Sequence, residues 1–198
     1  PDHVRVLQGN QATGKGIRDG LAWLRGKVAN DPEATAIIYY SGHGWKDKYS
    51  GEYFFISYDV DASGVRYSAL RATDFALEVS KMQPPRLLVL LDCCHAQGMG
   101  IKDVSDIEDF TPASLPAAIF MGTERGINPA VIAIPGSKGI DQLHKGRGRA
   151  VLSSSQSDQK SYMRSDGKMS LFTYHLIEAL TGHAEPKSGA SEVLVSDL

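Results

Sequence analysis

Cysteine is scarce in this chain of 198 residues, and its placement is restrictive. The sequence has two cysteines, Cys93 and Cys94, and they are adjacent. Because neighbouring residues cannot close a loop of any size, the sequence excludes a disulfide framework and favours a reducing, cytoplasmic setting. A chain of this length is expected to form one domain, 1–198, that buries roughly 70% of its unfolded surface without such bridges.

Long apolar runs and strong charge of one sign are also lacking. No run of 18 apolar residues occurs, so the sequence predicts no transmembrane helix. The formal net charge is -2, and the one short basic stretch covers residues 145–149. We therefore expect neither a nucleic-acid partner nor a membrane partner.

What is present is a short, uniformly apolar stretch that ends in reactive residues. Residues 87–91 are five apolar residues in a row, a pattern typical of a strand that is buried on both faces. Asp92, Cys93, Cys94 and His95 follow directly. In open parallel sheets ligands bind beyond the carboxyl ends of the strands, so chemistry is expected here. The alternative is that the cysteines only complete the core, because free cysteine is often buried.

The remaining pattern alternates between strands and helices. Helical spacing of apolar residues follows Thr13, a candidate N-cap, and a second helix is predicted from Thr73 to about Met82. This alternation predicts an α/β fold with a mostly parallel sheet. Further strands are predicted over residues 3–7, 34–40, 53–56 and 150–155, a helix over residues 170–180, and the start of another element over residues 192–198.

His43 follows the strand predicted over residues 34–40, just as Cys94 follows the apolar stretch 87–91. His43 stands between Gly42 and Gly44, and Cys94 follows it by 51 residues. A thiol of pKa about 8.5 needs a base to become a nucleophile, and a histidine is a suitable one. Two alternatives to this catalytic role are open. His43 could be a structural histidine of the core or of a turn, or His43 and Cys94 could bind a metal ion together with Cys93 and His95. The metal site is disfavoured because vicinal residues on a strand point to opposite faces.

The stretches IIYYSGHG and LLVLLDCCHAQG resemble the caspase-like cysteine peptidases, a clan that includes caspases and metacaspases. The Asp-x-Cys-His order is similar to metacaspases and bacterial caspase-like peptidases. RAVLSSSQSDQKSYMRSDGKMSLFTYHLIEALTG resembles the small-subunit half of the bacterial members. The resemblance implies a caspase-like three-layer sandwich, with helices on both faces of the sheet. It also implies a cysteine-type endopeptidase.

The same resemblance assigns roles to individual residues. Cys94 matches the nucleophile and His43 the catalytic histidine, and the reaction would pass through a thioester acyl-enzyme. The backbone N–H groups of Gly44 and Cys94 would form the oxyanion hole. Cys93 would be a packed neighbour, and His95 would be structural.

Asp92 bears on specificity. The resemblance places Asp92 in the S1 pocket, with Ser41 close to it, and so implies cleavage after Arg or Lys. Alternation along a strand puts positions 92 and 94 on one face, which agrees with this role. The alternative is a strand-end carboxylate that is hydrogen-bonded to backbone.

Many metacaspases need calcium, but the dense acidic run that would hold it is missing here. Calcium prefers six to eight oxygen ligands, whereas the acids that follow His43 are scattered. We therefore expect no cofactor, with calcium possible but not favoured. These acids are Asp47, Glu52, Asp59 and Asp61.

The resemblance also divides the chain. Residues 1–98 resemble the large-subunit half, and residues 150–198 resemble the small-subunit half. Residues 99–149 match the inter-subunit loop, and two alternatives are open for it: self-cleavage, or a long loop that is never cut. The family's first strand and helix and its C-terminal end have no counterpart here, so we expect another segment, or a sensor or regulatory partner, to cover the sheet edge. A role in regulated cell death or defence follows by analogy only. The rival functions are a catalytically silent interaction module and a separase- or gingipain-like peptidase with a different pocket.

Overall fold

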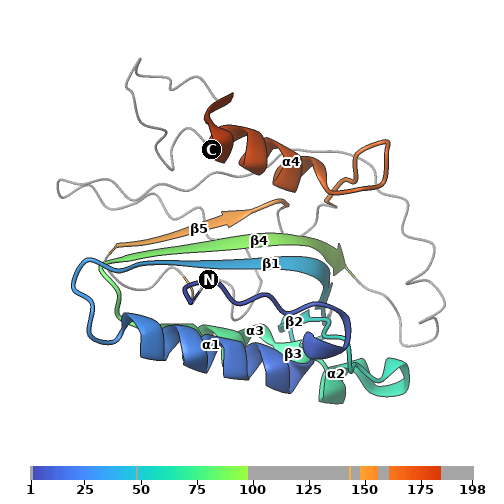
Figure 1. Cartoon of the computed structure of the whole chain (residues 1–198). Helices are drawn as coiled ribbons and strands as arrows, with labels where there is room; N and C mark the ends of the chain where they lie inside the picture. The colour runs from blue at the N-terminus through green and yellow to red at the C-terminus, as the bar shows by residue number, and fades with distance from the viewer. Residues whose placement is uncertain (1, 48, 98–142, 144–147, 156–160, 184–198) are drawn as a thin grey trace.

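The computed structural model of the chain describes residues 2–47, 49–97, 143, 148–155 and 161–183 (Figure 1). The predicted processing segment, residues 99–149, lies outside the described residues except at 143, 148 and 149. The element predicted over residues 192–198 lies outside them as well.

Three parallel strands form one side of a five-stranded sheet of order β3-β2-β1-β4-β5. β1 (Thr35–Lys46) and β4 (Arg86–Gln97) pair in register along their full length, and β5 (Arg149–Ser153) adds to β4 in the same direction. At the other edge, β2 (Tyr53–Phe55) and β3 (Leu70–Arg71) pair antiparallel. The sheet is therefore mixed, and the predicted parallel order holds for its three longest strands, β1, β4 and β5.

Helices cover both faces of this sheet, which gives the predicted three-layer α/β sandwich (Figure 1). α1 (Gly14–Val28) and α3 (Ala72–Ser80) pack on one face, and α4 (Leu171–Glu178) lies on the other. Thr13 is the N-cap of α1 as predicted, because its side chain accepts the N–H of Gly16 at 2.9 Å. Short helical segments complete the described elements: η1 (Gly9–Gln11), η2 (Ala62–Gly64), α2 (Val65–Ser68) and η5 (Ala179–His183).

Side chains of β4 alternate between two separate cores. Leu87, Val89, Leu91 and Cys93 join the core beneath α1 and α3, whereas Leu90 packs with α4 on the opposite face. Full burial of one such aliphatic side chain stabilises the fold by about 1.5–3 kcal/mol. The alternation fixes the register of β4, and with it the face on which each polar residue that follows must lie.

Two predicted elements differ from the structure. Residues 3–7 form no strand, since no described strand lies beside them, and Val4 and Val6 are exposed. Apolar alternation alone cannot make a strand, because a strand also needs a hydrogen-bonding neighbour. Thr73 is not an N-cap: α3 already begins at Ala72, and the Thr73 hydroxyl donates instead to the Glu52 carboxylate at 2.9 Å.

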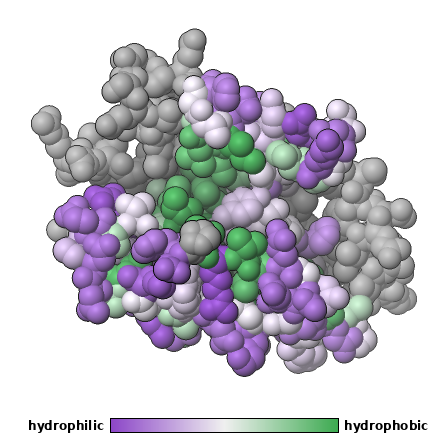
Figure 2. Space-filling model, viewed as in Figure 1, coloured by the Kyte–Doolittle hydropathy of each residue, from purple (hydrophilic) through white to green (hydrophobic). Residues whose placement is uncertain are grey.

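One long edge of β1 has little cover among the described residues. On the side away from β4, only Gly44–Lys46 pair with a strand, which is β2. Figure 2 shows apolar side chains gathered on the face between α4 and the N-terminal segment. The expectation that a further segment or partner covers this edge stays a prediction. The exposed large apolar residues of the segment before η1, of β1, and of α4 with η5 are Val4, Val6, Ile37, Tyr39, Ile177 and Leu180.

Candidate active site

The two candidate reactive positions, His43 and Cys94, are neighbours in the sheet. Both were expected just beyond a strand, but β1 and β4 continue through them, and position 43 is the register partner of position 94. Adjacent strands lie about 4.8 Å apart, so positions far apart in the sequence come within reach of one another. His43 is exposed at this point of β1. The pairing provides what thiol chemistry requires, an imidazole beside a cysteine position.

The peptide group between His43 and Gly44 is held from the β2 side. The His43 carbonyl accepts the N–H of Ile56 at 3.0 Å and the hydroxyl of Tyr40 at 2.8 Å. Because a trans peptide is planar, its N–H points opposite to its carbonyl, so the Gly44 N–H points toward β4. Gly44 itself is buried between β2 and β4.

Asp92 is buried, with 4% of its surface exposed, and its carboxylate is surrounded by hydroxyl groups. Ser161 donates to Oδ1 at 3.1 Å, and Thr173 donates to Oδ2 at 2.5 Å. Ser170 also donates to Oδ2, and Tyr39 reaches it at 3.5 Å. The described partners are all side-chain hydroxyls, which differs from the alternative of a carboxylate bonded to backbone.

No cation balances this carboxylate within the part of the chain that the structure describes. The ion pairs found there join other residues, and none of them includes Asp92. Hydroxyl groups satisfy hydrogen bonds but supply no full positive charge. A buried negative charge of this kind favours a positively charged group brought by a ligand.

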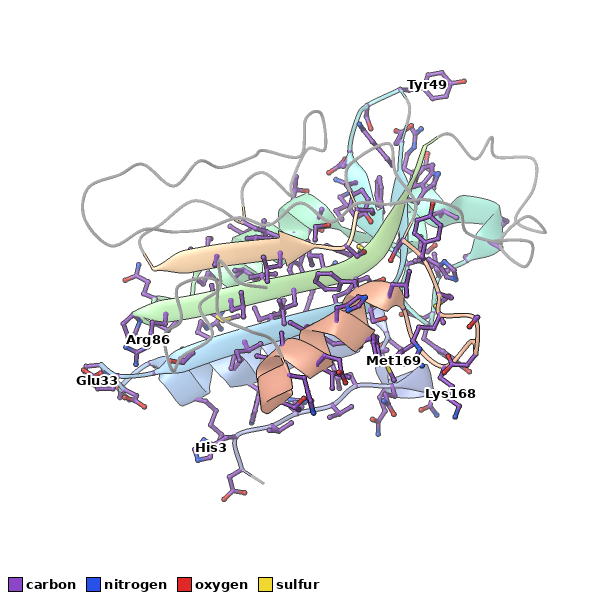
Figure 3. All side chains as sticks on the ribbon, turned by 90° about the horizontal axis from the view of Figure 1, so that it is seen from above. His3, Glu33, Tyr49, Arg86, Lys168 and Met169 are labelled. Atoms are coloured by element: carbon purple, nitrogen blue, oxygen red, sulfur yellow. The ribbon has the colours of Figure 1, made fainter. Side chains whose placement is uncertain are left out.

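The start of α4 contributes two of these hydroxyls. Ser170 is the N-cap of α4, so its oxygen accepts the N–H of Thr173 at 2.9 Å while its proton goes to Asp92. The positive end of the helix dipole therefore faces the carboxylate. In Figure 3, Lys168 and Met169, just before α4, lie toward the carboxyl ends of the strands, whereas Glu33 and Arg86 lie at the opposite end.

The other predicted site residues are placed differently. Ser41 is exposed and is the register partner of Asp92, but no hydrogen bond joins the two among the described contacts. Cys93 is buried on the opposite face from Asp92, where the hydroxyl of Tyr53 donates to its Sγ at 3.2 Å. This placement separates Cys93 from the candidate site and counts against the metal-site alternative.

Sequence reasoning did not single out Tyr40 or the hydroxyls around Asp92. Ser161, Ser170 and Thr173 stand about 70 to 80 residues after Asp92, so no local pattern links them to it. The one available signal was Ser170, a capping residue placed directly before an apolar helical stretch.

The acids considered as calcium ligands each have donors of their own. Asp47 is buried and pairs with Arg66 at 2.9 Å. Burial raises the pKa of Asp47, but hydrogen bonds from Ser50 and Tyr49 and the charge of Arg66 together hold it below its ordinary value. Within the described residues, no group of three or more His, Cys, Asp or Glu could hold a metal ion. The remaining acids accept hydrogen bonds as follows: Glu52 from Thr73, Asp59 from Gly14 and Ser57, and Asp61 from Ser63.

No helix in the described part of the chain has the length and apolar character needed to cross a membrane. Comparison with curated proteins and with solved structures gave no match. The family model of the caspase domain matches residues 3–195, which is nearly the whole chain. This match agrees with the mixed sheet, its helical layers and the pairing of a histidine with a cysteine position. The chain therefore belongs to the caspase-domain family of cysteine peptidases.

Proposed function

We propose that the chain is a cysteine endopeptidase in which His43 is the base and Cys94 the nucleophile. The observation that carries the proposal is the register of β1 and β4, which pairs position 43 with position 94. An exposed imidazole at that point is accessible to substrate and to water. The family match supports the peptidase class, and the assignment of the dyad is our inference from the pairing.

In the proposed reaction, the His43 imidazole takes the Cys94 proton, and the thiolate attacks the peptide carbonyl carbon. The carbonyl oxygen becomes an oxyanion, which the N–H groups of Gly44 and Cys94 stabilise. When this intermediate collapses, the C–N bond breaks and His43 gives its proton to the leaving amine. Water, deprotonated by His43, then hydrolyses the thioester and releases the acid and the thiol.

The oxyanion role places a requirement on Gly44. Its N–H points toward β4, the strand that carries Cys94, which is the correct direction. A regular parallel ladder would use this N–H for pairing with β4. The substrate oxygen must therefore take the place of the ladder partner when the peptide binds.

We further propose that the peptidase cleaves after Arg or Lys. Asp92 supplies a buried carboxylate that has hydroxyl partners and no described cation. A guanidinium or ammonium group of the substrate would complete this site, whereas an acidic side chain would add a second buried negative charge. Ser41, next to Asp92 in register, would line the mouth of the pocket.

Activity without calcium is the third part of the proposal. It is supported by the donors that already engage Asp47, Glu52, Asp59 and Asp61. Recruiting these acids to one calcium ion would break existing contacts of four separate side chains.

The test is hydrolysis of fluorogenic peptides that differ only in P1, which is Arg, Lys or Asp. Wild type is compared with Cys94→Ala and with Cys93→Ala, a matched control that removes the neighbouring thiol from the core. We expect Arg and Lys peptides to be cleaved by wild type and by Cys93→Ala, and not by Cys94→Ala. Cleavage after Asp would support the peptidase activity but would exclude recognition of a basic P1 side chain by Asp92. A folded wild type that cleaves none of the peptides would favour the silent interaction module.

A further inference from the structure

Tyr40 lies in β1 three residues before His43, and its side chain does not end in the core. The ring packs edge-on against Phe55, with centroids 4.7 Å apart, and the hydroxyl continues to the junction of β1 and β2. There it donates to the His43 carbonyl at 2.8 Å and approaches the Ile56 carbonyl at 3.2 Å. The shorter contact is the one to His43.

Gly42 makes this path possible. A Cβ atom at position 42 would lie 2.9 Å from the Tyr40 hydroxyl oxygen and 3.1 Å from the ring carbon that bears it. The backbone of Gly42 does not have positive φ, so space rather than conformation requires glycine here. The order Tyr40-Ser41-Gly42-His43 thus lets the tyrosine pass beneath the chain and reach the carbonyl three residues ahead.

The carbonyl that Tyr40 holds belongs to the same peptide unit as the Gly44 N–H. The atoms of a peptide unit are coplanar, so a donor fixed on the carbonyl oxygen also fixes the direction of that N–H. Hydrogen bonds in series also polarise one another, so a carbonyl that accepts a strong bond has a better N–H donor at its other end. Ile56 N–H holds the same oxygen at 3.0 Å, which leaves the unit bound at two points.

We propose that Tyr40 is a positioning residue for the oxyanion hole, acting through the His43–Gly44 peptide. The inference rests on the proposed function, because it requires the Gly44 N–H to meet the substrate oxyanion. Burial raises the pKa of Tyr40, so its hydroxyl keeps its proton and remains a donor across the range in which a histidine base works. Tyr40 itself contacts no reacting atom.

The test compares Tyr40→Phe with wild type and with Tyr53→Phe. Tyr53 is the matched control, because it is a fully buried tyrosine of the same core whose hydroxyl bonds to Cys93 Sγ instead. We expect Tyr40→Phe to lower kcat about tenfold, the rate equivalent of one hydrogen bond, with KM changed less than about twofold. Tyr53→Phe should leave both parameters unchanged, whatever its effect on Tm.

Two further measurements separate positioning from general damage. A peptide aldehyde forms a tetrahedral adduct that uses the oxyanion hole, so Tyr40→Phe should weaken its binding by the same factor as it lowers kcat. Alkylation of the active-site thiol by iodoacetamide does not use the hole, so its rate should stay at the wild-type value. Gly42→Ala should also lower kcat, because the added methyl group would displace the Tyr40 hydroxyl from the His43 carbonyl. In the double variant with Tyr40→Phe, the two decreases in kcat should not add.

The outcomes are distinct. Equal kcat in Tyr40→Phe and wild type, or equal losses in Tyr40→Phe and Tyr53→Phe, would overturn the positioning role and leave the peptidase in place. A slower alkylation rate that matches the fall in kcat would also overturn it, since the defect would then lie in the dyad. If wild type cleaves no peptide, both the proposed function and this inference fall.

Discussion

Replacing Asp92 with asparagine tests the pocket with little change in shape. Asn has the size of Asp, still accepts hydrogen bonds at one oxygen, and can donate through its amide to the surrounding hydroxyls. The side chain is 4% exposed, so the change removes a buried charge and not a packing contact. Because that charge has no described cation partner, we expect Tm to stay within about 4 °C of wild type, or about 1 kcal/mol.

The effect on catalysis should be much larger. Removing one partner of a buried, hydrogen-bonded charge pair costs about 2–4 kcal/mol, which corresponds to roughly 30- to 1000-fold in kcat/KM. We expect this loss for a peptide with Arg at P1. A peptide with citrulline at P1 has nearly the same shape and no charge, so its kcat/KM should change by less than about threefold.

The assay measures kcat/KM for both peptides with wild type and Asp92→Asn, alongside thermal unfolding of both proteins. Ser161→Ala provides a matched control, because it removes the hydroxyl on Oδ1 and keeps the charge. Equal losses for the arginine and citrulline peptides in Asp92→Asn would refute the charge argument. A fall in Tm well beyond 4 °C would show that Asp92 serves the fold and not the substrate.

Three further predictions concern the acids and the central segment. Chelation with EDTA should leave the rate of hydrolysis by wild type unchanged. A rate that falls with EDTA and is restored by added calcium would contradict this. The pKa of Asp47 is lower in the folded protein than in the unfolded chain. Its ionised carboxylate therefore stabilises the fold fully when the pH is above the pKa of the unfolded chain, and this stabilisation is lost as the pH falls through the pKa of the folded protein. The Tm difference between wild type and Asp47→Asn should therefore shrink below about pH 4, and a constant difference from pH 7 to 3 would exclude that linkage. Finally, mass spectrometry should find that wild type is cut after a basic residue of segment 99–149 and that Cys94→Ala is not cut. Arg149 should be spared, because it begins β5 and donates to the Met82 carbonyl at 2.7 Å. A wild type that hydrolyses peptides and yet stays intact would exclude self-processing.

The layers of the fold could be predicted because burial leaves a periodic trace in the sequence. Residues 87–91 are apolar without interruption since β4 is covered on both faces, by α1 and α3 on one side and by α4 on the other. Thr13 could be recognised as a cap because capping is a local interaction. The ends of the strands were harder to predict: polar residues follow Tyr40 and Leu91, yet β1 and β4 continue because each pairs with the other as far as Lys46 and Gln97.

The surroundings of the site could be predicted only in part. Two strand ends carrying His43 and Cys94 were enough to predict that these positions meet, and the register brings them together. The hydroxyls on Asp92 come from a segment distant in the chain, and serine or threonine at those positions has no distinctive pattern. Tyr40 continues an apolar run, so the sequence offers no sign that its hydroxyl leaves the core for the His43 carbonyl.

The measurement that tests the central claim most directly is hydrolysis of one P1-arginine peptide by wild type, His43→Ala and Cys94→Ala, with thermal unfolding as a check on folding. If the paired positions form the dyad, wild type cleaves the peptide, and each variant loses activity to near background while Tm stays close to that of wild type. Undiminished hydrolysis by either folded variant would contradict the dyad and with it the proposed mechanism.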